Sequence, residues 1–78
     1  MYTKEMVEYL AKALVDHPDE VNVTQVEGDK SIILELRVEP SDMGKVIGRR
    51  GRVAQAIRTI AKAAAVRDKK MVHVEIVD

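Results

Sequence analysis

The most informative stretch of the chain is GKVIGRRGR, residues 44–52, in which two glycines enclose two arginines. Glycine is unfavourable inside a helix, so Gly48 and Gly51 predict a sharp turn or a close approach to the backbone. Helical sequence follows the turn, and the unpaired N–H groups and dipole of a helix N-terminus attract anions. Because Lys45 and the arginines add positive charge, we expect this loop to bind an anion such as a phosphodiester backbone.

Two helices are predicted around the loop, one from about Met43 to Ile47 and a longer one from about Arg52 to Ala65. Glu39-Pro40 ends the preceding strand, and Ser41 or Asp42 can cap the short helix. The longer helix is expected to bury an apolar stripe, which consists of Val53, Ile57, Ile60 and Ala64. Its outer face is predicted to carry Arg52, Gln55, Arg58 and Lys62.

A further helix is predicted at the N-terminus, between the candidate cap Thr3 and the helix-ending Pro18. Its apolar stripe, with spacings of three and four, consists of Met6, Val7, Leu10 and Leu14. Residues 21–26 and 32–38 then predict two strands of an antiparallel hairpin. In the turn between them Gly28 can take a positive φ at low cost.

A last strand follows the long helix, since Val72, Val74 and Ile76 alternate with other residues. It can lie parallel or antiparallel to its neighbour. The order is α-β-β-α-α-β, and we expect one α+β domain over residues 1–78, with a three-stranded sheet and all helices packed on one face. The opposite face is expected to be polar, with Glu35, Arg37, His73 and Glu75 as its candidates.

The charge of the chain is balanced overall but divided along the sequence. Thirteen Lys+Arg and thirteen Asp+Glu give a formal net charge of zero. Residues 1–43 hold four basic and ten acidic residues, whereas residues 44–78 hold nine basic and three acidic ones. A polyanion responds to the local field, so the zero net charge does not exclude nucleic acid. The alternative is an ordinary solvated helix face.

The composition excludes several classes of protein. Without cysteine there is no disulfide, thiolate metal site or cysteine nucleophile, which fits the cytoplasm as the expected location. With no Phe or Trp and two Tyr, the chain is unlike an RNA-recognition motif, which stacks bases on aromatic residues. No apolar run approaches the ~20 residues that span a bilayer, so no membrane partner is expected.

No catalytic site, metal site or cofactor is expected. His17 and His73 are isolated in the sequence, and Ser41 has no obvious base partner. The glycine loop lacks the terminal Lys-Ser/Thr of a P-loop, and it does not follow a strand directly as a dinucleotide fingerprint does. In a helix-turn-helix the two arginines would lie in the turn and not on the recognition helix.

Residues 46–51, VIGRRG, with helices predicted on both sides, resemble the GxxG core of the KH domain, a module that binds single-stranded nucleic acid, and the longer string DMGKVIGRRGRVAQAIRTI, residues 42–60, extends the resemblance. The element order resembles the type II arrangement, and the whole chain resembles the small bacterial RNA-binding proteins of the KhpA family. One departure is Ala54, where many KH domains have a larger aliphatic residue. We expect Val53 and Ile57 to fill the core instead, with the helix slightly rotated.

The resemblance implies a groove for about four unpaired nucleotides. The glycines would let phosphates approach, the arginines between them would contact phosphates or sugars, and flanking residues would line one wall and extend the contacts. The second strand of the hairpin would form the opposite wall. The implied RNA-binding residues are Lys45, Val46, Ile47, Gly48, Arg49, Arg50, Gly51, Arg52 and Gln55.

The resemblance also implies a non-enzymatic RNA chaperone or post-transcriptional regulator, linked to cell shape, division and envelope homeostasis. The implied partner is a second copy of the chain or a larger KH-containing RNA-binding protein of the KhpB type. Two alternatives stay open. The chain can be a dimerisation module that uses the small residues of Ala61–Ala65, or it can bind single-stranded DNA in the same groove.

Overall fold

The structure, a computed structural model, describes residues 2–77, with only the backbone of Tyr2. The helices are α1 (Tyr2–Leu14), α2 (Met43–Ile47) and α3 (Arg52–Ala65), and the strands are β1 (Asn22–Glu27), β2 (Ser31–Arg37) and β3 (Met71–Val77). Short 3-10 turns connect them: η1 (Pro18–Glu20), η2 (Pro40–Asp42), η3 (Arg49–Gly51) and η4 (Val66–Asp68). The predicted order α-β-β-α-α-β is therefore confirmed.

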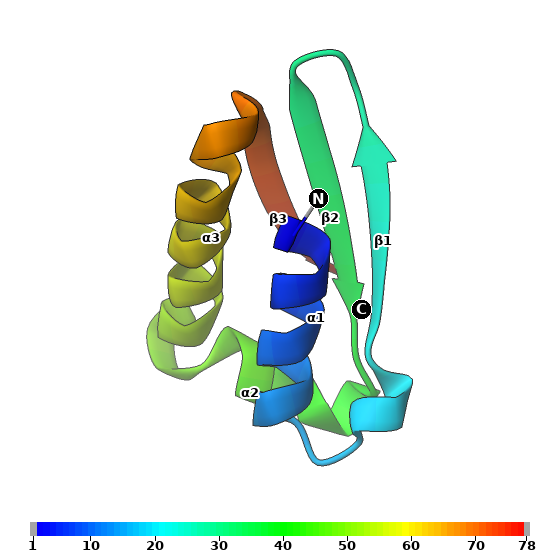
Figure 1. Ribbon diagram of the computed structural model, residues 1–78. Coiled ribbons are helices and arrows are strands. Elements are labelled where there is room, and N and C mark those ends of the chain that lie inside the picture. Colours follow the sequence, from blue (N-terminus) through cyan, green and yellow to red (C-terminus); the bar gives the residue numbers. More distant parts are fainter. Residues whose placement is uncertain (1, 78) are drawn as a thin grey trace.

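The three strands form one mixed sheet in the order β1-β2-β3. β1 pairs with β2 in antiparallel fashion, and β3 lies parallel to β2, which resolves the direction that the sequence left open. β2 is thus the central strand and β3 an edge strand, and α1, α2 and α3 all lie on one side of the sheet (Figure 1). On the other side Arg37, His73 and Glu75 are exposed and Glu35 is half-buried, so the predicted polar residues lie on this face, together with the exposed apolar residues Val26 and Met71.

The hairpin turn differs from its prediction in one detail. The N–H of Gly28 donates to the carbonyl of Ser31 at 2.8 Å, which closes the turn between β1 and β2. Gly28 is not among the residues with positive φ, so the expected use of its conformational freedom is wrong. Asp29 and Lys30 lie between the hydrogen-bonded residues Gly28 and Ser31, and the turn forms without a left-handed glycine at position 28.

α1 buries a face that shares only Val7 with the predicted stripe. Thr3, Val7 and Ala11, spaced four apart, are fully buried, whereas Leu14 is 41% exposed and Leu10 is half-buried. Thr3 lies inside the helix, which begins at Tyr2, so the expected cap is wrong. Small and β-branched side chains at the contact let the helix approach the sheet closely, and this displaces the larger leucines to the edge of the contact.

α3 shows the same preference for small residues at its contact. Its buried positions are Ala54, Ile57, Ala61 and Ala65. Of the predicted stripe only Ile57 is buried. Val53 and Ala64 are half-buried, and Ile60 is 42% exposed. Ala54 faces inward, Ile57 fills the core as expected, and Val53 packs against the core while half-buried. Ala61 and Ala65 pack inside the protein, which removes both from any surface for self-association.

The core lies between the helices and the sheet, and its largest fully buried side chains on β2 are Ile32, Leu34 and Leu36. Their period of two matches the pleat of the strand, as the sequence predicted. Within residues 2–77 no helix is long and apolar enough to cross a membrane.

Candidate nucleic-acid interface

The loop between α2 and α3 is built from left-handed backbone. Gly48 has φ 77° and ψ 177°, Arg50 has φ 57° and ψ 27°, and Gly51 has φ 74° and ψ 14°. The N–H of Gly48 donates to the carbonyl of Gly44 at 2.9 Å, and the N–H of Gly51 donates to the carbonyl of Gly48 at 3.2 Å. The chain therefore turns sharply between the two helices, as the glycine spacing predicted. The positive φ of Arg50 costs about 1–2 kcal/mol in a non-glycine residue.

The two glycines meet different demands. A Cβ on Gly48 would lie 2.8 Å from the backbone nitrogen of Val53 and closer still to its side chain, so the absence of a side chain lets α3 begin close to the loop. A Cβ on Gly51 would meet nothing within 4 Å, and only the positive φ requires glycine there. The space beside the Cα of Gly51 is therefore open, and an outside group can approach the backbone there.

Positive side chains surround this open backbone. Arg49, Arg50 and Arg52 are exposed, and none of them takes part in an ion pair within the described chain. Gln55 is also exposed, one turn along α3 from Arg52. These four residues and the N-terminus of α3 gather positive charge and hydrogen-bond donors at one place.

The predicted residues before the loop are less available for binding, because one is paired and one is buried. Lys45 is exposed, but its Nζ lies 3.0 Å from Oδ2 of Asp16, and the hydrogen bond and charge of Asp16 raise the pKa of Lys45 above its ordinary value. The side chain of Val46 is fully buried, so it supports α2 from inside instead of lining a wall. Ile47 is 39% exposed.

The strand that faces α3 at the open edge of the sheet is β3, because β2 has neighbours on both sides. A hollow of about 310 Å³ lies between α3 and this edge, lined among others by Arg58, Lys62 and His73. The Nε of Arg58 donates to the carbonyl of Val74 at 3.1 Å. Ile33 of β2 also lines this hollow, so β2 and β3 both contribute to its wall, and β3 contributes the larger part.

Arg58 and Lys62 were placed on the outer face of the helix by sequence reasoning but not in the candidate site. Their spacing of three and seven residues from Gln55 puts them on the same helical face, and this signal was present in the sequence. His73 carried no such signal, because only the parallel placement of β3 beside α3 brings it there.

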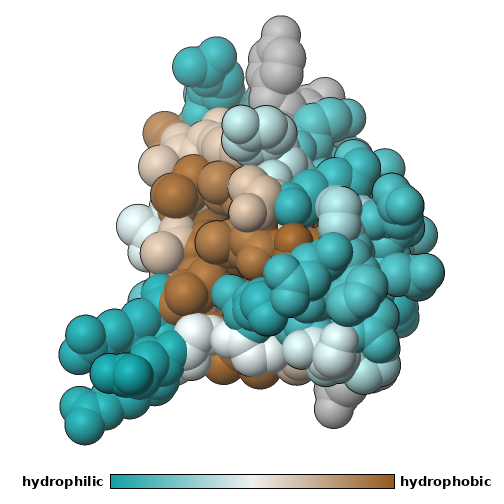
Figure 2. All heavy atoms as spheres, turned by 90° about the horizontal axis from the view of Figure 1, so that it is seen from below, coloured by the Kyte–Doolittle hydropathy of each residue, from teal (hydrophilic) through white to brown (hydrophobic). Residues whose placement is uncertain are grey.

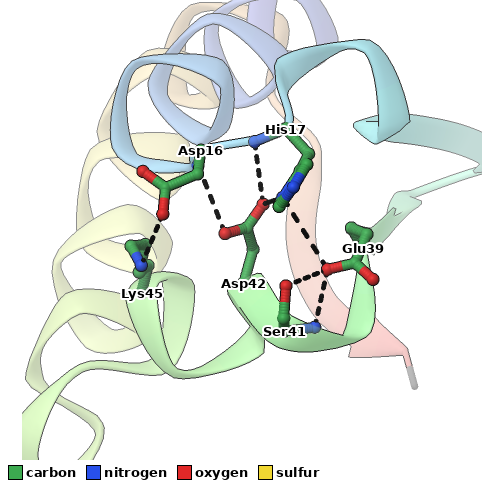
Figure 3. A network of polar contacts seen from close by, with 6 residues as sticks. All are labelled: Asp16, His17, Glu39, Ser41, Asp42 and Lys45. Atoms are coloured by element: carbon green, nitrogen blue, oxygen red, sulfur yellow. Dashed lines mark hydrogen bonds and ion pairs between the residues drawn. The ribbon is translucent and has the colours of Figure 1, made fainter.

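A polar cluster ties the end of α1 to the segment before α2 (Figure 3). Asp42 is 1% exposed; its Oδ1 accepts from the N–H of Asp16 at 3.2 Å, and its Oδ2 accepts from the N–H of His17 at 2.9 Å. The Nδ1 of His17 also lies 2.9 Å from Oδ2. Asp42 is the N-cap residue of α2, as one of the two predicted candidates, but its side chain makes no capping hydrogen bond. The free N–H groups beyond α1 attract the carboxylate instead.

The polar cluster shifts the pKa values of both His17 and Asp42. The hydrogen bond with Asp42 raises the pKa of His17 above its ordinary value, against the effect of desolvation. Burial acts to raise the pKa of Asp42, but the hydrogen bonds from His17 and from the backbone of Asp16 and His17 outweigh it, so this pKa is lowered. Both shifts favour the charged pair, which holds the α1–η1 connection against η2.

An apolar groove of about 340 Å³ lies between α1 and α3, lined among others by Leu10, Leu14, Val53 and Ile60. Figure 2, which views the molecule from the end where α2 lies, shows apolar side chains gathered in one exposed patch with hydrophilic side chains around it. The leucines displaced from the α1 contact and the exposed Ile60 contribute to this groove. Sequence reasoning missed it because it assigned these residues to the core.

Several known proteins are similar in sequence to this chain over nearly its whole length. The family model for the KH domain of KhpA and KhpB matches residues 4–76. The RNA-binding protein KhpA of Clostridium perfringens is 61% identical over 74 residues, which are 95% of this chain and 99% of the relative. The protein of the same name from Bacillus subtilis is 46% identical over 77 residues, 99% of this chain and 95% of the relative.

Solved structures show the same fold. A crystal structure of Era in complex with MgGDPNP and nucleotides 1506–1542 of 16S ribosomal RNA has a TM-score of 0.66 at 21% identity. The likeness covers 95% of this chain and 28% of the Era chain. Together with the element order it confirms the α+β fold of a type II KH domain. With the family model and the high identity of its relatives, the chain belongs to the KhpA/KhpB family of KH-domain proteins.

Proposed function

We propose that this protein binds single-stranded RNA through the loop at residues 48–51 and the basic face of α3. The observation that carries the proposal is the open, left-handed backbone at Gly51 with three exposed arginines around it, at the N-terminus of α3. The relatives named as RNA-binding proteins support it. The chain acts as a binding module and not as an enzyme, in keeping with its family.

In this proposal the phosphates lie against the loop and the bases face the β3 edge. Arg49, Arg50 and Arg52 supply charged donors, and the glycines keep the backbone accessible. The contacts of Lys45, Ile47 and Gln55 extend the site, whereas Val46 contributes through its backbone. Contacts to phosphate position a strand without reading its sequence, so base preference is modest.

The wider role is part of the same proposal and draws on the family alone. The protein acts in the cytoplasm as an RNA chaperone or post-transcriptional regulator, with links to cell shape, division and envelope homeostasis. Arg58, Lys62 and His73 join the RNA-binding face, because they line the hollow between α3 and β3.

The test is the affinity of the double variant Arg49→Asp, Arg50→Asp for a short single-stranded RNA. Aspartate tolerates the left-handed conformation of Arg50, so the fold is expected to survive. If each arginine contributes a charged hydrogen bond of about 1.5 kcal/mol, affinity falls at least about a hundredfold. The charge-matched control Lys30→Asp, Arg37→Asp changes exposed residues of the hairpin and is expected to keep most of the binding.

Unchanged affinity in the folded double variant would overturn the proposal. Equal losses in the double variant and its control would reduce it to a non-specific charge effect. Competition between RNA and DNA of one sequence distinguishes the open alternative, since only RNA offers a 2′-hydroxyl. A stronger competition by DNA would assign the groove to single-stranded DNA.

A second candidate function is dimerisation, with a second copy of the chain or with a larger KH-containing protein of the KhpB type. The apolar groove between α1 and α3 favours it, since Leu14 and Ile60 are large and exposed there. The family model, which covers both KhpA and KhpB, is in keeping with such a partner. Sedimentation of Ile60→Asp is expected to show loss of the dimer, and Val26→Asp, at an exposed position on β1, is its control. A wild-type chain that sediments as a monomer would contradict self-association.

A further inference from the structure

We propose that His17, Glu39 and Asp42 form a binding site for a divalent transition-metal cation of the zinc class. The three side chains come from the connection after α1, from the end of the segment after β2, and from η2 (Figure 3). Each offers one ligand atom, and these atoms all lie within 4.8 Å of one another. His17 is distant in the sequence from Glu39 and Asp42, which are close to each other, so the complete cluster exists only in the folded chain.

The distances suit a small tetrahedral ion. The Nδ1 of His17 lies 2.9 Å from Oδ2 of Asp42 and 3.7 Å from Oε2 of Glu39. Zinc bonds to nitrogen and oxygen of about 2.0–2.2 Å place tetrahedral ligand atoms about 3.3 Å apart. The two distances lie on either side of this value. The imidazole of His17 is about half exposed, which leaves its ring room to adjust around an ion.

The two carboxylates are already held in place by backbone donors that an ion does not displace. The backbone N–H groups of Asp16 and His17 bond to Asp42, and the N–H of Ser41 donates to Oε2 of Glu39 at 2.8 Å. The hydroxyl of Ser41 bonds to the same oxygen. Outer partners of this kind orient metal ligands. The ion replaces the proton shared between His17 and Asp42 and the bond from the Ser41 hydroxyl to Oε2 of Glu39, while the backbone donors stay in place.

The donor set selects the class of cation. Two carboxylates and a neutral imidazole carry a charge of −2, which a divalent ion neutralises. One nitrogen and two oxygens suit zinc, whereas calcium takes six or more oxygen ligands and magnesium six. With three protein ligands, the fourth position is left to water. Asp16 stays outside the set, because its carboxylate is paired with Lys45.

A bound ion would join the end of α1 to the segment that leads into α2. Asp42 lies six residues before Gly48, which is the first residue of the loop. The ion would therefore stabilise the support of the loop without touching the arginines. Its effect is on the folded state, which binds the ion, and not on the unfolded chain, in which the three ligands are apart.

The experiment is a titration of the tag-free, chelator-treated full chain with Zn²⁺ alone, followed by calorimetry and by the imidazole signals in NMR. We expect one saturable site, a shift of the His17 signals and unmoved His73 signals. His17→Gln is expected to abolish the binding, and the matched control His73→Gln to keep it. Glu39→Gln, which leaves the buried Asp42 intact, is expected to weaken binding about tenfold or more.

Three results would overturn the inference. These are the absence of saturable binding up to millimolar Zn²⁺, binding that survives in folded His17→Gln, and binding that depends on His73. If His17→Gln does not fold, Glu39→Gln decides, and unchanged affinity in that variant rejects the site. Displacement of zinc by millimolar Mg²⁺ would reject the assignment to the zinc class.

Discussion

Lys45 beside the glycine loop is paired with Asp16 at the end of α1, at 3.0 Å between Nζ and Oδ2. An RNA phosphate that approaches Lys45 must compete with this carboxylate. Asp16→Asn removes the competitor, and an exposed pair of this kind is worth about 0.2–1 kcal/mol. We expect RNA affinity to rise by up to about fivefold. The salt dependence of log affinity is expected to steepen by up to about 0.7, the value of one added phosphate contact on a single strand.

Fluorescence titrations at several salt concentrations measure both quantities. Asp19→Asn is the matched control, because this substitution removes the same charge from an exposed residue of η1. An equal rise in both variants would show a general charge effect and contradict a specific role for the Asp16–Lys45 pair.

The two loop glycines are predicted to differ in what they contribute to stability. Gly51→Ala adds a left-handed non-glycine residue in open space, at a cost of about 1–2 kcal/mol. Gly48→Ala adds the same strain and a collision with Val53, so it is expected to be clearly more destabilising. Urea unfolding of both variants checks the order. If Gly48→Ala is as stable as Gly51→Ala, the start of α3 at Val53 can shift to accommodate the added methyl group without strain.

The face that α3 buries is testable with two isoleucines one turn apart. Ile57 is 3% exposed and Ile60 is 42% exposed. Replacing Ile57 by alanine leaves a cavity in the core and is expected to cost about 2–5 kcal/mol of unfolding free energy. Ile60→Ala is expected to cost much less, measured by denaturant unfolding at a concentration where the chain is monomeric. Equal losses would contradict the position of the helix.

The pair formed by Glu27 and Lys70 predicts a pH dependence at the far end of the sheet. The hydrogen bond from Lys70, and then its charge, hold the pKa of Glu27 below its ordinary value. A carboxylate with a lowered folded-state pKa adds stability above its unfolded pKa, and this is lost as the pH falls through the folded-state pKa. The effect is small because both side chains are in contact with solvent.

Carboxyl NMR of Glu27 measures this pKa directly. In Lys70→Met the pKa is expected to return toward its ordinary value. The carboxyl of Asp29, in the same turn, is the internal control. A pKa of Glu27 that does not move in the variant would show that another group holds it down.

Local features of the fold were predictable because neighbouring residues alone determine them. The alternation of Ile32, Leu34 and Leu36 predicted the central strand, and the glycine spacing predicted the turn between α2 and α3. The start of α3 at Arg52 was correct for the same reason, since the glycines that end the turn adjoin the helix. The arginines of the loop were predictable as an anion-binding group from their spacing and from the helix N-terminus that follows them.

Errors arose where a residue's role depends on a distant partner. A helix with several apolar faces can bury any of them, and the close approach of α1 and α3 to the sheet chose the faces with small residues. Asp42 was placed as a cap by its position before α2, but the N–H groups of Asp16 and His17 lie across the fold and take its carboxylate. The same tertiary contact region pairs Lys45 with Asp16.

The sequence by itself determined the order of the elements, the sharp turn at the glycines and the concentration of positive charge after residue 43, because these follow from short-range sterics and composition. Only the tertiary structure decided that β3 forms the edge beside α3, that Val46 is buried, and that His17, Glu39 and Asp42 meet. The physical reason is that such contacts join segments far apart in the chain. Their geometry is set by how closely whole helices and strands can pack, which no local pattern records.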